Sequence, residues 1–423
     1  MDPEDCLRTM IMKLLRALLL PLLVLCAIYP SSSTAHGERA QMPQLRMRTV
    51  HWIDVQASTT KLSINEIVKI SGKFMPSKYW PHHVDSIEET AFLNIGVPGP
   101  SFVRLDSRVN GVPMIRSTSF RKGEVYDFEI TLKARKVGRY HVHTVINVEG
   151  AGPMIGPGMW VEVTGDEAAF QNTAKTLLGE TIDLETYGLG NVMFWSALWF
   201  AVGLAWFVYW LTKCPIVVPR FKRAAELGVE ADQLITPMDR RIGGIFLVLT
   251  LSLIVGGYVY AQEKWPITTP LQTGKIDVPP LDQPPTPISI KLIEARYRIP
   301  GRSFRMEFDV INSGDRPVTI GEFAAGNLRF INAKVLDVKP KDEHDLVASD
   351  ALRVEGAPVA PGSTQRVVIY ADDAMWETER MTTMISSPDA VVAGVLSFFD
   401  DAGGRHLVEF GGPMIPDFGM VKG

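Results

Sequence analysis

Two long segments without a charged residue restrict what this chain can fold into more than any other feature. They are residues 191–212, which are followed by Lys213, and residues 242–261. Each is about 20 residues long, the length that an α-helix needs to cross the hydrocarbon core of a membrane. Trp and Tyr lie near the ends of both, as they do at the level of lipid headgroups. The sequence therefore predicts two membrane helices, at about 191–213 and 242–261.

The first 35 residues have the layout of a secretory leader. Basic residues precede an apolar stretch at 17–28, and small residues follow up to Ala35. Cleavage after Ala35 would make His36 the first residue of the mature chain. The alternative is an uncleaved membrane anchor, for which the apolar stretch is short.

The charges that flank the two spans predict their orientation. The short loop between the spans is basic, whereas residues 180–190 contain acidic residues and no Lys or Arg. Positively charged short loops stay in the cytoplasm. We therefore expect a multi-pass protein of the inner or intracytoplasmic membrane, with both large flanking segments on the periplasmic or external side.

Cysteine content and net charge exclude two further interpretations. Of the three cysteines, only Cys214 lies outside the predicted leader, so the exported segments cannot be held together by disulfides. The net charge of −4 gives no sign of a nucleic-acid partner.

Both flanking segments show the period-two alternation of half-buried strands. Residues 126–134 place an apolar side chain at every second position, and residues 304–310 do the same. Gly and Pro separate such runs, as in β-sandwiches. The predicted fold is mainly β, with two β-sandwiches flanking a membrane helix hairpin. The expected domains are a signal peptide (1–35), a first exported domain (36–188), the hairpin with its cytoplasmic loop (189–265), a proline-rich linker (266–287) and a second exported domain (288–423).

Histidines in the first exported segment form the strongest candidate site. His141 and His143 share one face of a predicted strand, because successive side chains alternate. His36, as a new N-terminus, would add an imidazole and an amine. Such a nitrogen set suits Cu(II), although three histidines also suit zinc. The alternative is an accidental surface pair. His344, in a charged stretch of the second segment, is expected to be solvated.

Several longer stretches resemble the B subunit of particulate methane monooxygenase and ammonia monooxygenase. They follow the same order through nearly the whole mature chain. They are HGERAQMPQLRMRTVHW (36–52), HVHTVINVEGAGPMIGPGMW (141–160), LLGETIDLETY (177–187), ITTPLQTGK (267–275), IPGRSFRMEFDVINSGDRPVTIGEF (299–323) and the final GGPMIPDF.

This resemblance implies two cupredoxin-like domains flanking two transmembrane helices, with copper in the first domain. It implies assembly with mostly helical A and C membrane subunits as a trimer of heterotrimers. By motif match, the copper ligands would be the amine and imidazole of His36 with His141 and His143, and Glu38 would lie nearby. The resemblance leaves open whether the copper of this subunit performs the oxidation, so no catalytic residue is assigned.

The resemblance also marks a second metal position that this chain retains only in part. Some relatives place one histidine in RTxHW and another in GKFH, where this chain has His51 and Met75. A thioether can hold Cu(I), but the pair of imidazoles is broken. We predict no second copper site and a structural role for His51.

The function that the resemblance implies is a copper-dependent membrane monooxygenase acting on a small substrate with O2. HGERAQ looks nearer to the ammonia enzymes, whereas RTVHW and HVHT look nearer to the methane enzymes. We favour methane or another short hydrocarbon, with ammonia as the alternative. A copper-binding or copper-delivery protein is less favoured, because such proteins are usually one small soluble β domain.

Overall fold

The computed structural model separates into two compact units, which are described one at a time. The first covers Gln171–Leu271, and the second covers Thr34–Phe170 with Gln272–Gly423. The predicted leader, His36 and Glu38 lie outside the described residues. The structure describes residues 41–176, 178–211, 217–266, 274–283, 285–298, 303–342, 344–386 and 389–419.

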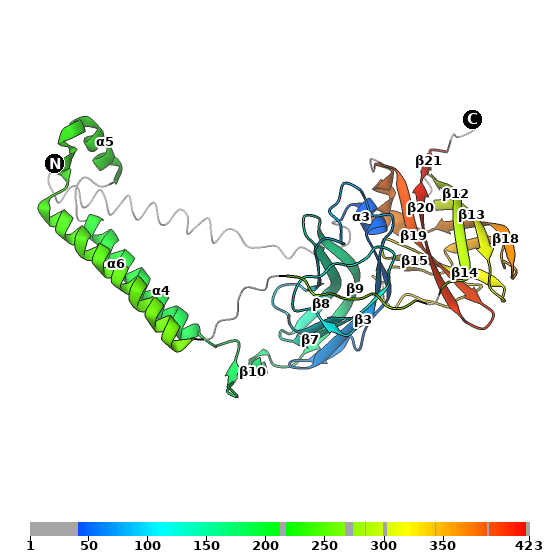
Figure 1. Ribbon diagram of the computed structural model, residues 1–423, viewed down its shortest axis with the longest axis horizontal. Helices are drawn as coiled ribbons and strands as arrows, with labels where there is room; N and C mark the ends of the chain where they lie inside the picture. Colours follow the sequence, from blue (N-terminus) through cyan, green and yellow to red (C-terminus); the bar gives the residue numbers. More distant parts are fainter. Residues whose placement is uncertain are drawn as a thin grey trace. The chain divides into compact units, whose positions relative to one another are not determined.

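The first unit contains the two apolar helices, drawn in green in Figure 1. Both α4 and α6 are long and apolar enough to cross a membrane, and they contain most of the two predicted spans. Asp239, in the first turn of α6, forms a capping box with Thr236 and also accepts a hydrogen bond from Tyr209 Oη of α4 at 2.5 Å. The elements are β10 (Thr173–Lys175), β11 (Thr181–Asp183), α4 (Leu189–Leu211), α5 (Val217–Leu227), η2 (Gly228–Leu234) and α6 (Pro237–Lys264).

The second unit begins with a β-sandwich whose two sheets have the strand orders β1-β3-β7-β5-β6 and β2-β9-β8-β4. The alternation predicted for residues 126–134 is confirmed: every second residue of β7 is buried in the core. Its elements are α3 (Pro43–Arg48), β1 (Val50–Ala57), β2 (Lys61–Ser63), β3 (Ile67–Pro76), β4 (Ala91–Gly96), β5 (Phe102–Val109), β6 (Val112–Pro113), β7 (Tyr126–Ala134), β8 (Gly138–Val148), β9 (Gly152–Thr164) and η1 (Glu167–Ala169).

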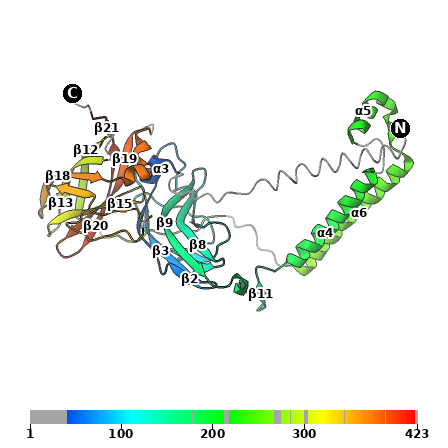
Figure 2. The same cartoon turned by 180° about the vertical axis from the view of Figure 1, so that it is seen from behind.

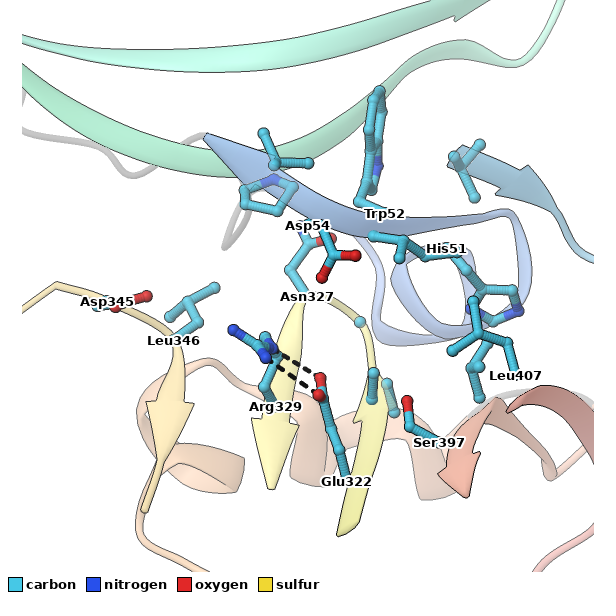
Figure 3. Close-up of a pocket in the computed structure, with 18 of the residues that line it drawn as sticks. His51, Trp52, Asp54, Glu322, Asn327, Arg329, Asp345, Leu346, Ser397 and Leu407 are labelled. Atoms are coloured by element: carbon cyan, nitrogen blue, oxygen red, sulfur yellow. Dashed lines mark hydrogen bonds and ion pairs between the residues drawn. The ribbon is translucent and has the colours of Figure 1, made fainter. Parts of the chain in front are cut away.

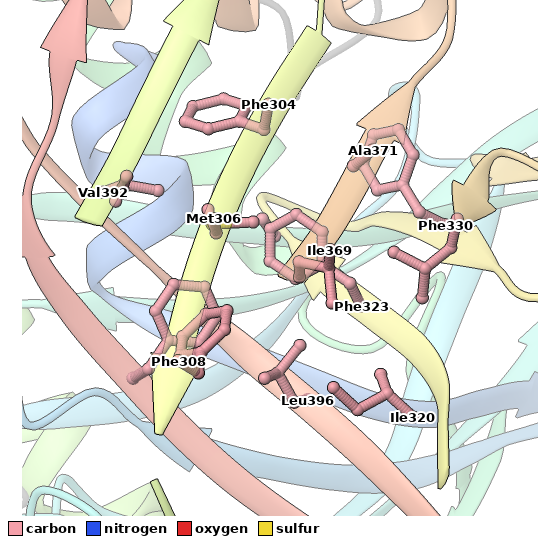
Figure 4. Close-up of a cluster of buried hydrophobic side chains, with 14 of the residues drawn as sticks. Phe304, Met306, Phe308, Ile320, Phe323, Phe330, Ile369, Ala371, Val392 and Leu396 are labelled. Atoms are coloured by element: carbon pink, nitrogen blue, oxygen red, sulfur yellow. The ribbon is translucent and has the colours of Figure 1, made fainter. Parts of the chain in front are cut away.

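A second β-sandwich follows, with strand orders β17-β18-β13-β12-β21 and β16-β15-β14-β19-β20. Phe304, Met306 and Phe308 of β13 point into its core, as their alternation predicts (Figure 4). Its elements are β12 (Ile288–Arg298), β13 (Ser303–Asn312), β14 (Val318–Ala325), β15 (Leu328–Ile331), β16 (Val347–Ala348), β17 (Leu352–Glu355), β18 (Ser363–Asp372), α7 (Met375–Thr378), η3 (Met381–Ser386), β19 (Val391–Asp400), β20 (Arg405–Pro413) and β21 (Ile415–Asp417).

The two sandwiches are joined by buried contacts. Met47 of α3 lies in the core of the second sandwich, although α3 directly precedes β1 of the first. Part of the proline-rich segment also packs on the first sandwich: Val278 is buried in its core, and the Leu281 N–H donates to the Val125 carbonyl at 2.9 Å. A contact surface therefore runs between the sandwiches.

Candidate metal centre

Strand β8 brings His141 and His143 together as the sequence predicts. Nδ1 of His141 lies 2.9 Å from Nε2 of His143, and the two rings meet edge to face with centroids 4.4 Å apart. Val142 and Ile146 point to the opposite face and are fully buried in the core. Burial of that face fixes the strand, so the two imidazoles are held on its outer side. Figure 2 shows β8 beside its partner β9.

A β-bulge in β9 gives His143 its orientation. His143 pairs with Gly158 and Val145 pairs with Ile155, so two residues of β9 face one residue of β8. The extra length turns the Gly156 carbonyl toward His143, whose Nδ1 lies 3.1 Å from that oxygen. Because a carbonyl can only accept, Nδ1 carries the proton, which leaves the lone pair of Nε2 available to a metal.

A glycine makes room for the pair. A Cβ placed on Gly158 would lie 2.5 Å from Cε1 of His143 and still closer to Cε1 of His141. No side chain other than hydrogen therefore fits under the two rings in these positions. Gly158 ends the GPG run at 156–158, which could have indicated a close approach here.

The two nitrogens fit a copper ion in type and spacing. Two ligand atoms about 2.0 Å from one ion and at a right angle to each other are about 2.8 Å apart, close to the separation seen here. A hydrogen bond between the two rings has the same length, so the pair is compatible with the metal-free state as well. Among the described residues, no group of three His, Cys, Asp or Glu side chains is placed to hold a metal.

Trp160 is a neighbour of the pair that sequence reasoning missed. Its ring lies 4.8 Å from that of His141, and the Arg139 guanidinium lies 4.5 Å from the indole centroid. The expectation that His344 is solvated is wrong, because its half-buried ring packs 5.4 Å from Trp160. Residues 158 and 160 share one face of their strand, and this could have indicated Trp160. The contact of Trp160 with His344 of the second sandwich could not be predicted from the sequence around either residue.

His51 and Met75 face each other across β1 and β3, and both are buried. The partner of His51 is Glu409 of β20: His51 Nε2 lies 3.0 Å from Glu409 Oε1. Ser77 Oγ and the Lys78 N–H also donate to this carboxylate, at 2.5 and 3.1 Å. These contacts support the structural role predicted for His51.

The surroundings of Glu409 act on its pKa in two directions. Burial alone would raise the pKa of the carboxyl. The hydrogen bond and charge of His51, with the hydrogen bonds from Ser77 and Lys78, outweigh burial and lower that pKa. The carboxylate is therefore ionised at neutral pH and can hold His51 at the boundary between the sandwiches.

A cavity of about 110 Å³ lies between the sandwiches (Figure 3). In its wall, Glu322 accepts two hydrogen bonds from Arg329, at 2.6 and 3.0 Å, and hydrogen bonding to Glu322 is the largest cause of a raised Arg329 pKa. Arg405 donates twice to Asp54 across the boundary, each at 2.9 Å. Gly158 also lines the cavity, so one glycine separates it from the histidine pair.

Comparison with known proteins identifies the family. The model of the monooxygenase B-subunit protein family matches residues 37–418. The particulate methane monooxygenase alpha subunit of Methylococcus capsulatus strain Bath is 43% identical over 394 residues, covering 93% of this chain and 94% of that protein.

Two solved structures show weaker likeness. The cupredoxin domain of amoB from Nitrosocaldus yellowstonii matches at 18% identity with a TM-score of 0.24, covering 29% of this chain and 92% of that one. The N-terminal periplasmic domain of ScsB from Proteus mirabilis matches at 11% identity with a TM-score of 0.18, covering 87% of this chain and 99% of that one. At these TM-scores neither likeness establishes a shared fold. The family model and the 43% identical relative decide the question: the chain belongs to the family of monooxygenase B subunits and is part of a monooxygenase complex.

Proposed function

We propose that this chain is the copper-binding B subunit of a membrane monooxygenase that hydroxylates methane or another short hydrocarbon with O2. The observation that carries the proposal is the imidazole pair in a family member: His141 Nδ1 and His143 Nε2 lie 2.9 Å apart over Gly158. Bound copper would activate O2, and the protein would provide nitrogen ligands in a fixed geometry.

The third protein ligand in this proposal is His36, through its amine and imidazole after cleavage at Ala35. Gln41, five residues later, accepts a hydrogen bond from the Ile155 N–H at 3.0 Å and donates to the Pro153 carbonyl. Five residues span at most about 17 Å. The three residues from Ile155 to Gly158 cover only about 10 Å of strand. The stretch of chain before Gln41 is therefore long enough for His36 to reach the pair.

In this proposal the residues of the first sandwich hold and orient the metal. The Gly156 carbonyl keeps the proton of His143 on Nδ1, so that Nε2 carries the lone pair that would bind the metal. The ring of His141 lies against Trp160, which restricts its rotation. The amine of a mature N-terminus has a reference pKa of about 8, so its deprotonation by copper is easy near neutral pH.

The family supports the proposed substrate and assembly. The relative named above is a methane enzyme by its printed name, which favours a hydrocarbon. Ammonia is the second candidate, because the stretch HGERAQ resembles the ammonia enzymes. We propose assembly with A and C membrane subunits as a trimer of heterotrimers, with α4 and α6 in lipid and both sandwiches outside the cytoplasm.

Copper analysis of the purified complex tests the metal site. We expect copper in the wild type, nitrogen hyperfine structure in its Cu(II) electron paramagnetic resonance spectrum, and a marked loss of that copper in His141→Ala/His143→Ala. The matched control is His82→Ala/His83→Ala, an exposed histidine pair of the same sandwich, which should keep the copper. Undiminished copper in the first variant would refute the site.

Two further measurements test the remaining parts of the proposal. N-terminal sequencing should find His36 first, and any other first residue would remove the amine ligand. Oxidation assays on whole cells with methane and with ammonia should show faster turnover of methane. The opposite ranking would select the ammonia alternative.

A further inference from the structure

The β-bulge beside the candidate copper site is held from two sides at one residue. The Ile155 N–H donates to Gln41 Oε1 at 3.0 Å, and the Ile155 carbonyl accepts a hydrogen bond from Asn327 Nδ2 at 3.1 Å. The next residue along β9 is Gly156, whose carbonyl meets His143 Nδ1. Both anchors therefore lie one residue from the group that orients His143.

These anchors come from segments far away in the sequence. Asn327 belongs to the second sandwich and lies in the turn between β14 and β15, 172 residues after Ile155. Its backbone φ is 70°, and that of the preceding Gly326 is 56°. The tight left-handed turn projects the Asn327 amide away from its own sandwich and onto β9.

The same turn also holds the segment that carries Gln41. Arg46 of α3 donates from Nη2 to the Gly326 carbonyl at 3.0 Å and from Nη1 to the Glu379 carbonyl at 2.6 Å. The guanidinium is buried, so these hydrogen bonds are not in competition with bulk water. One two-residue turn of the second sandwich thus contacts both α3 and the bulge.

A bulge needs such support. Ile155 is the last residue of β9 in register with β8 before the bulge, and its backbone N–H and carbonyl take their partners from side chains outside the sheet. Without Gln41 and Asn327, the Ile155 N–H and carbonyl would lose these partners, and the neighbouring Gly156 carbonyl would be free to turn. His143 could then rotate or change tautomer, and its nitrogen would no longer face that of His141.

We propose that Gln41 and Asn327 are positioning residues for the copper ligand His143, so that the second sandwich holds the metal site of the first in its binding geometry. This inference rests on the proposed copper function. It assigns a role to the second sandwich, whose described residues include no three-ligand metal group.

The decisive variant is Asn327→Gly in the intact complex. Glycine adopts the positive φ of this position without strain, so the turn is kept and only the amide is removed. The matched control is Asn65→Gly. Asn65 also has a positive φ of 72°, and its amide donates to the Ala169 carbonyl at 2.7 Å, away from the histidine pair.

Copper affinity is measured by competition with a chelator of known affinity, and the ligand geometry is read from the Cu(II) electron paramagnetic resonance spectrum. Loss of a group that orients a metal ligand typically weakens affinity about 10- to 100-fold. Because Asn327 acts through one more residue, we expect the lower end, about tenfold, with a changed nitrogen hyperfine pattern. Asn65→Gly should stay within about twofold of the wild type, with an unchanged spectrum.

If the complex with Asn327→Gly does not assemble, a second variant tests the same proposal. Gln41→Met removes both hydrogen bonds to β9 at nearly constant volume and should shift affinity and spectrum in the same direction. Its matched control is Gln44→Met in the same segment, where the amide lies 3.5 Å from Met42 Sδ. Wild-type affinity and spectrum in both Asn327→Gly and Gln41→Met would overturn the positioning role while leaving the copper site intact. A wild-type complex without copper would overturn the proposed function itself.

Discussion

The first sandwich presents two buried histidines, His143 and His51, that meet opposite kinds of partner. His143 faces a second imidazole, and a backbone carbonyl holds its proton on the far side of the ring. His51 faces the carboxylate of Glu409, which also accepts from Ser77 and Lys78. A carboxylate partner makes a buried hydrogen-bonded pair, whereas two imidazole nitrogens side by side make the candidate metal site. Both histidines are buried, so the chemical type of the partner group distinguishes the structural histidine from the candidate metal ligand.

The largest effect is expected on the structural side of this comparison. Glu409→Ala leaves the donors that this carboxylate accepts from, His51, Ser77 and Lys78, without their acceptor, and a buried polar group left unsatisfied typically costs about 1–3 kcal/mol. We expect a lower denaturant midpoint for the purified complex and unchanged copper content. Loss of copper in this variant would contradict the separation of the two sites.

A methyl group added under the imidazole pair should act mainly on the metal side. Gly158→Ala places a Cβ within 2.5 Å of both rings, so they must move apart. We expect copper affinity to fall about 100-fold, close to 2.7 kcal/mol. Gly96→Ala is the matched control, because Gly96 pairs with His143 from the other neighbouring strand and its Cβ would meet Val145 at 3.4 Å, an ordinary contact. Equal affinities in the two variants would show that the close approach is unimportant.

The Glu409 carboxylate should also make the contact between the sandwiches sensitive to acid. The pKa of Glu409 is lowered in the folded state, so its contribution is fully present above the unfolded value of about 4.3 and is lost as the pH falls through the folded value. His51, Lys78 and Tyr79 are the titratable neighbours, and the Tyr79 pKa is raised by burial and then by Glu409.

This sensitivity is measured as the unfolding midpoint of the wild type and of Glu409→Gln from pH 7 to pH 3. The wild type should lose its advantage over the variant below about pH 4.3. Parallel curves would mean that the carboxylate is not the acid-sensitive group.

The smallest effect is expected from the aromatic neighbour of the pair. Trp160→Leu keeps an apolar side chain but removes the ring that packs on His141 and His344. An aromatic pair contributes about 0.5–1.5 kcal/mol beyond its buried area, which corresponds to a change of roughly two- to tenfold in copper affinity. A larger loss than that of Gly158→Ala would give Trp160 a greater role than packing.

The sequence predicted those features whose cause is local. Alternation at 126–134 and 304–310 corresponds to strands with one buried face, because side chains of a strand alternate whatever lies around it. The same rule placed His141 and His143 on one face, and the long uncharged segments became α4 and α6. Family motifs supported the copper proposal, which the histidine pattern had already suggested, and marked His51 and Met75 as a second position.

Only the tertiary structure decided which distant residues act on these histidines. Glu409 follows His51 by 358 positions, and Asn327 follows Ile155 by 172, so no pattern along the chain links them. The bulge that turns Gly156 toward His143 depends on the register between β8 and β9, and His344 meets Trp160 through contact between two sandwiches. Periodicity determines which face a side chain occupies, whereas register and domain packing determine what that face meets.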